Sequence, residues 1–216
     1  MFKHVVKALM IMALSVSLLS GCAKSEIGNI SLEAGESGVY IHKDGVVEYE
    51  IYEDFGESYY DKKDLKKKVK DEIDSFNAGG ASKSLDAAKL NYFGVKDKKV
   101  KVIIEFKSTS DFVNYLVECN EEENSTTFIG KISDAVSAGI PFKGEFAEIS
   151  NSEATGEVAK GKEIREMDLN VIAIKEKMKV QLDSSVKYIS QNCEVKDNIV
   201  DITDSEQTII VYEEAK

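Results

Sequence analysis

Two stretches in which apolar residues recur at every second position constrain this fold more than any other feature of the sequence. They are residues 39–54, "VYIHKDGVVEYEIYED", and residues 99–106, "KVKVIIEF". A period of two is typical of strands with one buried face and does not fit a helix. The chain is therefore expected to build a sheet that buries one face and exposes the other.

The first stretch predicts a hairpin around Lys43-Asp44-Gly45, and two turn lengths are open. A two-residue Asp-Gly turn would mix apolar and polar side chains, placing Tyr40, His42, Val47, Tyr49 and Ile51 on one face. A three-residue turn with Gly45 left-handed separates them better. It buries Val39, Ile41, Val47, Tyr49 and Ile51 and leaves Tyr40, His42, Glu48 and Glu50 outside. We therefore expect the three-residue turn.

A helix is predicted after each of two hairpins. The first spans residues 62–77, with Asp61 as its N-cap and Gly79-Gly80 as its stop. Its apolar stripe is Leu65, Val69, Ile73 and Phe76. A second hairpin turns near Asp97-Lys98, and a second helix follows a cap among Ser108–Ser110, with Phe112, Tyr115, Leu116 and Cys119 on one face.

This order predicts an α+β fold: an antiparallel sheet from two hairpin–helix units with the helices on one face, followed by a β-rich C-terminal part. Residues 39–120 form the first half and 121–216 the second, which is either separate or continuous with the first. In the second half we expect a short helix ending at Gly139, a long hairpin or mobile loop over 144–161, and closely spaced strands from Asp168 onward.

The N-terminus has the pattern of a signal peptide over residues 1–21. Lys3 and Lys7 precede a predominantly apolar run of twelve residues, 8–19, whereas a membrane-spanning helix needs about 20. The following run Leu19-Ser20-Gly21-Cys22 resembles the lipobox of bacterial lipoproteins. That resemblance implies a diacylglyceryl group on the Cys22 thiol and cleavage before Cys22, and two acyl chains give stable anchoring. The alternative is an ordinary secretory signal with a cysteine nearby.

A lipid on Cys22 would place the chain at the cell membrane, on its extracytoplasmic face. Residues 22–38 are polar and rich in Gly and Ser, which predicts a flexible tether. The stretches "DGVVEYEIYEDFGESYYDKKDLKKKVKDEIDSFN", "FIGKISDAVSAG" and "VKYISQNCEVKDNIVDI" resemble a group of uncharacterised lipoproteins of Gram-positive gut anaerobes. This resemblance implies a location and carries no activity.

The net charge excludes some partners. The chain has 39 acidic and 28 basic residues, a net charge of -11. Loss of residues 1–21 would take Lys3 and Lys7 with it, leaving 26 basic residues and a net charge of −13. Nucleic acid and anionic headgroups would be repelled by such a surface, so neither is an expected partner.

No catalytic or metal-binding motif is visible. His42 would be the single histidine after processing and is expected to face solvent, and there is no H-E-x-x-H or Cys-x-x-Cys. We expect no cofactor, no metal and no catalytic residue. Cys119 and Cys193 could pair in an exported protein, but free buried thiols are favoured because Cys119 lies on an apolar helix face.

These observations favour a non-enzymatic, lipid-anchored binding or envelope-associated module. The alternative is an envelope hydrolase that uses a pair of carboxylates brought together by the fold. Tyr59 and Tyr60 are candidates for a contact surface or, alternatively, for packing over the start of the first helix. The ligand, protein partner and oligomeric state cannot be read from the sequence.

Overall fold

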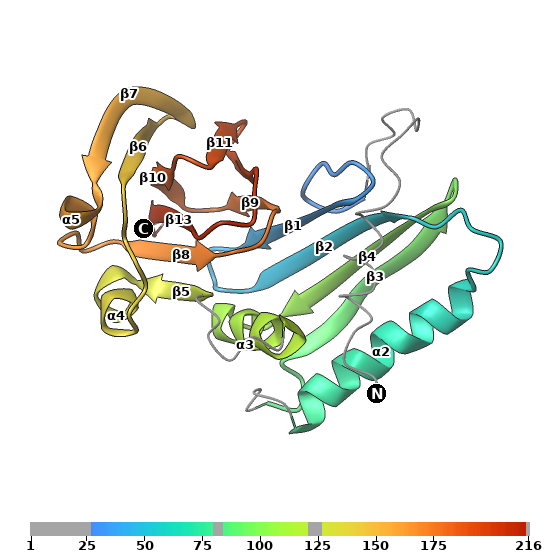
Figure 1. The fold of residues 1–216 in the computed structure, drawn as a ribbon. Helices are drawn as coiled ribbons and strands as arrows, with labels where there is room; N and C mark the ends of the chain where they lie inside the picture. Colours follow the sequence, from blue (N-terminus) through green and yellow to red (C-terminus); the bar gives the residue numbers. More distant parts are fainter. Residues whose placement is uncertain (1–26, 80–83, 121–126, 215–216) are drawn as a thin grey trace. The chain divides into compact units, whose positions relative to one another are not determined.

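The computed structural model describes residues 27–79, 84–120 and 127–214 (Figure 1). These residues form four helices and thirteen strands, which confirms a mixed α+β fold. The chain divides into two compact units. Unit 1 contains residues 1–40 and 45–122, and unit 2 contains residues 41–44 and 123–216. Each unit is described by itself.

Unit 1 contains four antiparallel strands and two helices. The strands are β1 (Glu36–Ile41), β2 (Val47–Asp54), β3 (Ala88–Lys96) and β4 (Lys99–Phe106), in the order β1-β2-β4-β3. Helix α2 (Lys62–Gly79) follows β2, and α3 (Thr109–Asn120) follows β4 (Figure 1). Strands β2 and β4 pair without interruption, from Val47 opposite Phe106 to Asp54 opposite Lys99.

The alternating pattern correctly predicted the buried apolar side chains of one face of the sheet. Nine predicted residues are buried: Val39, Ile41, Val47, Tyr49, Ile51, Val100, Val102, Ile104 and Phe106. Gly45 has a φ of +85°, the left-handed conformation expected in the three-residue turn. Phe106 is the centre of an aromatic cluster, since its ring lies 5.5 Å from Phe112 and 5.0 Å from Tyr115.

Both helix starts have the expected caps. The Asp61 carboxylate accepts hydrogen bonds from the backbone N–H groups of Lys63 and Asp64, at 2.7 and 2.9 Å. These bonds hold the pKa of Asp61 below its usual range. At α3 the Ser108 hydroxyl accepts a hydrogen bond of 3.1 Å from the Asp111 N–H. Each cap satisfies amides that have no partner within the helix.

Part of the predicted tether is packed rather than free. Residues 22–26 lie outside the described part of the chain, but Ile30 and Leu32 are 1% and 0% exposed, and β1 already begins at Glu36. The physical reason is the alternation of Ile30 and Leu32, which gives this polar segment one apolar edge to bury. A free tether therefore cannot extend to residue 38.

Unit 2 is rich in strands. Its larger sheet has the order β5-β8-β13-β10-β6-β7, and β11-β12-β9 are neighbours in a second group. The first group comprises β5 (Phe128–Lys131), β6 (Glu145–Ser150), β7 (Glu153–Lys160), β8 (Asn170–Ile174), β10 (Ser185–Ser190) and β13 (Thr208–Glu213). The second comprises β9 (Lys179–Leu182), β11 (Cys193–Lys196) and β12 (Ile199–Ile202).

Two short helices, α4 (Ile132–Ser137) and α5 (Gly161–Ile164), complete unit 2. Between the two alternatives for residues 144–161, the structure has the hairpin, β6–β7. The core of this unit gathers side chains from both helices, from the link between α4 and β6, and from the larger sheet: Ile132, Ala135, Ile140, Phe142, Phe146, Ala159, Ile164, Val171, Ala173, Ile209 and Val211. In the described part of the chain, no helix combines the length and apolar character needed to cross a membrane.

Candidate functional site

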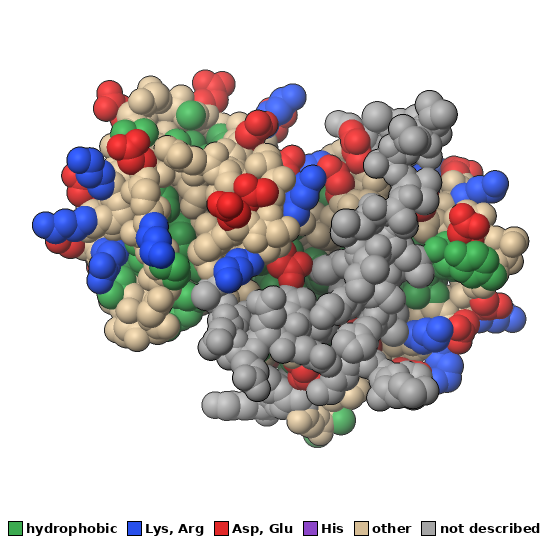
Figure 2. All heavy atoms as spheres, viewed as in Figure 1, with side chains coloured by type: hydrophobic (Ala, Val, Ile, Leu, Met, Phe, Trp, Pro, Cys, Tyr) green, Lys and Arg blue, Asp and Glu red, His purple; other side chains and the backbone are tan. Residues whose placement is uncertain are grey.

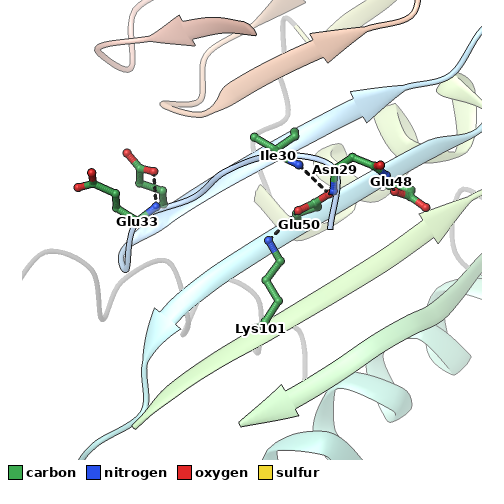
Figure 3. Close-up of polar contacts among 7 residues, drawn as sticks. Asn29, Ile30, Glu33, Glu48, Glu50 and Lys101 are labelled. Carbon is green, nitrogen blue, oxygen red and sulfur yellow. Dashed lines mark hydrogen bonds and ion pairs between the residues drawn. The ribbon is translucent and has the colours of Figure 1, made fainter. Parts of the chain in front are cut away.

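Cys22, the predicted lipidation site, lies outside the described residues and remains a prediction. The described chain begins five residues later, at Ile27. The segment that follows is held on the sheet of unit 1 by a group of polar contacts, shown in Figure 3. We call Asn29, Ile30, Glu50 and Lys101 the Glu50 network.

The centre of the Glu50 network is a buried ion pair between neighbouring strands. Glu50 of β2 is 0% exposed and Lys101 of β4 is 3% exposed. The Lys101 Nζ donates a hydrogen bond of 2.6 Å to the Glu50 Oε2. The register of β2 and β4 explains why these two side chains are in contact. Glu50 lies opposite Ile103, and Lys101, two residues before Ile103, projects from the same face of the sheet.

The second carboxylate oxygen of Glu50 binds the chain that precedes β1. Its Oε1 accepts hydrogen bonds from the backbone N–H groups of Asn29, at 2.7 Å, and Ile30, at 3.4 Å (Figure 3). Gly28 makes this approach possible because its φ is +97° and a Cβ there would lie 2.2 Å from the Glu50 Oε2. The expected outward position of Glu50 is therefore wrong: the segment at residues 28–30 covers it.

A second acidic residue supports the same segment. The Asn29 side-chain amide donates a hydrogen bond to the Glu48 carboxylate, whose other oxygen accepts one of 3.3 Å from the Asn91 amide. Asn29 thus binds two carboxylates of β2, one through its backbone and one through its side chain. A segment held this way has little freedom to leave the sheet.

The electrostatics of the Glu50 network match a structural anchor. Burial lowers the pKa of Lys101 below its usual range, and the hydrogen bond that Lys101 donates to Glu50 opposes that shift. A buried ion pair is tolerated when its remaining hydrogen-bonding capacity is used, as it is here by the two backbone amides. Both oxygens of the Glu50 carboxylate are thus bonded within unit 1, to Lys101, Asn29 and Ile30.

Glu53 is the second buried carboxylate on β2, at 5% exposed. It lies opposite Val100, on the face that carries the apolar core, whereas Glu50 is on the other face. Burial, and to a lesser degree the neighbouring Asp54 charge, raise the pKa of Glu53 to about 7, and Lys99 opposes them. Glu53 therefore titrates in the neutral range, but it does not share a site with Glu50.

His42 and Cys193 show no catalytic arrangement. His42 is half-buried rather than facing solvent, with its Nδ1 3.9 Å from the Asp183 Oδ2. Cys193 is a free thiol. Burial raises its pKa to about 12, despite an opposing hydrogen bond from Thr208, so the reactive thiolate is scarce at neutral pH. The side chain of Cys119 lies outside the described part.

The two candidate tyrosines lie in the link between β2 and α2. Tyr60 stacks on Phe55 with ring centroids 5.0 Å apart, and Tyr59 meets the Tyr60 ring edge-on at 4.8 Å. Tyr59 is 75% exposed. Tyr60 thus packs beside the helix start, whereas Tyr59 projects into solvent; Figure 2 shows a hydrophobic patch beside this link.

Figure 2 shows acidic and basic side chains interspersed on the face in view. Within residues 27–79, 84–120 and 127–214, no group of three or more His, Cys, Asp or Glu side chains could hold a metal ion.

No protein-family model, curated protein or solved structure matches the chain.

The Glu50 network was missed in the sequence for a definite reason. Alternation places Glu50 and Lys101 on the polar face of their strands, where solvent exposure is the default expectation. The usable signal was Gly28-Asn29 followed by the apolar Ile30 and Leu32, a short pattern that fits a segment crossing a sheet.

Proposed function

We propose that this chain is a lipid-anchored module of the extracytoplasmic face of the cell membrane, tied through Cys22 and acting by binding rather than by catalysis. Support for the location comes from the lipobox pattern at residues 19–22. Support for binding rather than catalysis comes from the buried carboxylates Glu50 and Glu53, which lie on opposite faces of β2; the proposal depends most on this observation.

The Glu50 network fixes how far unit 1 can lie from a lipid on Cys22. Five residues, 23–27, separate Cys22 from Gly28. Six steps of extended chain span about 20 Å at most. Under this proposal the tether is short, and unit 1 is held next to the membrane rather than displayed far from it.

The position of the carboxylates favours binding over hydrolysis. A carboxylate-pair hydrolase needs two acids facing one substrate, about 5–9 Å apart. Glu50 and Glu53 are the buried acids of the described chain, and they project from opposite faces of β2. Glu50 is also neutralised by Lys101.

We further propose that unit 1 consists of two hairpin–helix units, β1–β2–α2 and β3–β4–α3, with both helices on one sheet face. The aromatic contacts support this arrangement: Phe76 of α2 lies 6.3 Å from Phe106 and 5.4 Å from Tyr115 of α3. Phe112 of α3 lies 5.6 Å from Tyr49 of β2. Neighbouring rings from both helices and both central strands thus share one core.

Fractionation of cells that express the full chain tests the anchor. Cys22→Ala should move the protein from the membrane fraction to the soluble or secreted fraction, because the acyl chains have no other attachment. Cys193→Ala is the matched control, since it removes a thiol without touching the lipobox, and it should stay with membranes. A Cys22→Ala protein that still sediments with membranes contradicts the proposal.

A further inference from the structure

A hollow in unit 2 lies where three chain segments meet. It is bordered by the β6–β7 turn, the start of β10 and the β11–β12 hairpin, and its volume is about 210 Å³. We call it the unit 2 pocket; it is lined by Ile149, Ser150, Asn151, Ser152, Ser185, Val186, Lys187, Val195 and Asn198.

The two hairpin turns at the unit 2 pocket are linked to each other. Asn151 and Ser152 in one turn, and Asn198 in the other, have positive φ values of 51°, 62° and 63°. The Ser152 hydroxyl donates a hydrogen bond of 3.2 Å to the Asn198 Oδ1, and the Asn198 amide donates one of 3.2 Å to the Leu182 carbonyl. Hydrogen bonds therefore hold the two turns on this side of the pocket together.

Two β-bulges lie beside the same hollow. The pairing of β10 with β13 shifts between Val186 and Tyr188, which makes Lys187 the extra residue. The pairing of β6 with β7 shifts between Ala147 and Ile149. A bulge redirects the neighbouring side chains, and bulges are over-represented next to binding sites. Val186, Lys187 and Ile149 line the pocket at these two irregularities.

The lining consists of neutral polar side chains, aliphatic side chains and one lysine. Serine hydroxyls and asparagine amides can both donate and accept hydrogen bonds, and three serines and two asparagines line the pocket. Ile149, Val186 and Val195 complete the lining, and of these Ile149 and Val186 are only 3% and 9% exposed. The single charged group, Lys187, already has a partner, because its Nζ lies 3.0 Å from the Glu213 Oε2.

We propose that the unit 2 pocket binds a neutral, polyhydroxylated ligand of the size of one sugar ring. Ring hydroxyls both donate and accept hydrogen bonds, as the three serines and two asparagines of the lining do. Drug-sized ligands occupy pockets of about 300–1,000 Å³, so this smaller volume selects a single ring. An anion would gain little binding free energy in this pocket, because Lys187 is already paired with Glu213 and the chain carries a net charge of -11.

This inference names the ligand class of the proposed binding module. It rests on the binding part of that proposal and is independent of the lipid on Cys22. Binding can be measured on purified full chain in detergent, whereas the anchor is tested by fractionation. Failure of one experiment therefore leaves the other conclusion intact.

Saturation-transfer NMR of the full chain with glucose, galactose, mannose and N-acetylglucosamine tests the inference. We expect saturable binding of at least one of them. Ser185→Leu should weaken that binding at least tenfold by filling the pocket, and Asn198→Gly should weaken it by removing the amide while keeping the positive φ. Ser133→Leu, on α4 outside the pocket, is the matched control and should bind unchanged.

Three results would overturn the inference: no saturable binding of any of the four sugars, equal binding by both pocket variants, or tighter binding of inorganic phosphate than of every sugar. The exposed position of Ser185 at the start of β10 makes its substitution compatible with folding. Circular dichroism of each variant checks this, and the two variants alter different walls, so a fold defect in one leaves the other to decide.

Discussion

Replacement of Glu50 by glutamine should destabilise unit 1 strongly, because it leaves the buried Lys101 ammonium without its carboxylate. Lys101 is 3% exposed and its Nζ lies 2.6 Å from Glu50. Removing one partner of a buried ion pair costs about 3–5 kcal/mol. Glutamine keeps a carbonyl oxygen that can accept from Asn29, so most of this cost belongs to the ion pair.

The loss of stability in Glu50→Gln should depend on pH and on whether Lys101 is still present. Burial already lowers the pKa of Lys101. In Glu50→Gln the opposing contribution of Glu50 is gone, so the pKa of Lys101 falls further. The unfolded chain then binds the proton more tightly than the folded chain, and stability rises with pH up to the ordinary lysine pKa. A second change, Lys101→Met, removes the unpaired cation and should recover about 2 kcal/mol or more.

The assay is urea unfolding of the full chain followed by circular dichroism, together with amide hydrogen exchange. Exchange at the Asn29 and Ile30 amides reports the Glu50 network directly, since both donate to the Glu50 Oε1. Glu48→Gln is the matched control: it lies on the same strand and bonds to neutral amides, so its cost should stay below about 1 kcal/mol.

The reasoning is refuted if Glu50→Gln costs less than about 1 kcal/mol. It is also refuted if Lys101→Met adds to that cost instead of reducing it, or if the Asn29 and Ile30 amides exchange at unchanged rates. Any of these would mean that the buried pair does not hold the segment at residues 28–30.

Three further predictions concern single side chains. The raised pKa of Glu53, about 7 against 4.5, means that the folded chain binds this proton more tightly, so its contribution to stability falls as pH rises from 4.5 to 7. Glu53→Gln should raise the free energy of unfolding in urea by about 1–2 kcal/mol at pH 8, after allowance for solvent screening, and leave it unchanged at pH 4. Gly28→Ala should cost about 1–3 kcal/mol in the same unfolding assay, because of its φ of +97° and the clash with Glu50, and a variant as stable as the parent would contradict the geometry. Cys193 should react with iodoacetamide at least tenfold more slowly in the folded chain than in urea, since burial raises its pKa to about 12, and equal rates by mass spectrometry would count against the buried thiol.

The sequence predicted what depends on local pattern. Alternation identified the buried apolar residues on one face of β2 and β4, and the caps Asp61 and Ser108 were read from residue type and spacing. Each of these features is decided by residues within a few positions of one another. Local chemistry was sufficient for them.

Contacts between distant residues explain what was missed. Glu50 was expected outside because alternation cannot show that residues 28–30, about twenty positions earlier, return to cover it. Lys101 is 51 residues from Glu50, and the Ser152–Asn198 contact joins residues 46 apart. A side chain that looks exposed within its own strand can thus be buried or line a pocket once the fold brings another segment over it.

The most direct test of the account is the mass of the N-terminal peptide of the protein purified from membranes. We predict that the peptide begins at Cys22 and carries a diacylglyceryl group on the thiol, with the mass heterogeneity of natural acyl chains. A peptide that begins at any other residue, or an unmodified Cys22 thiol, would contradict the lipid anchor and the membrane-proximal position of unit 1.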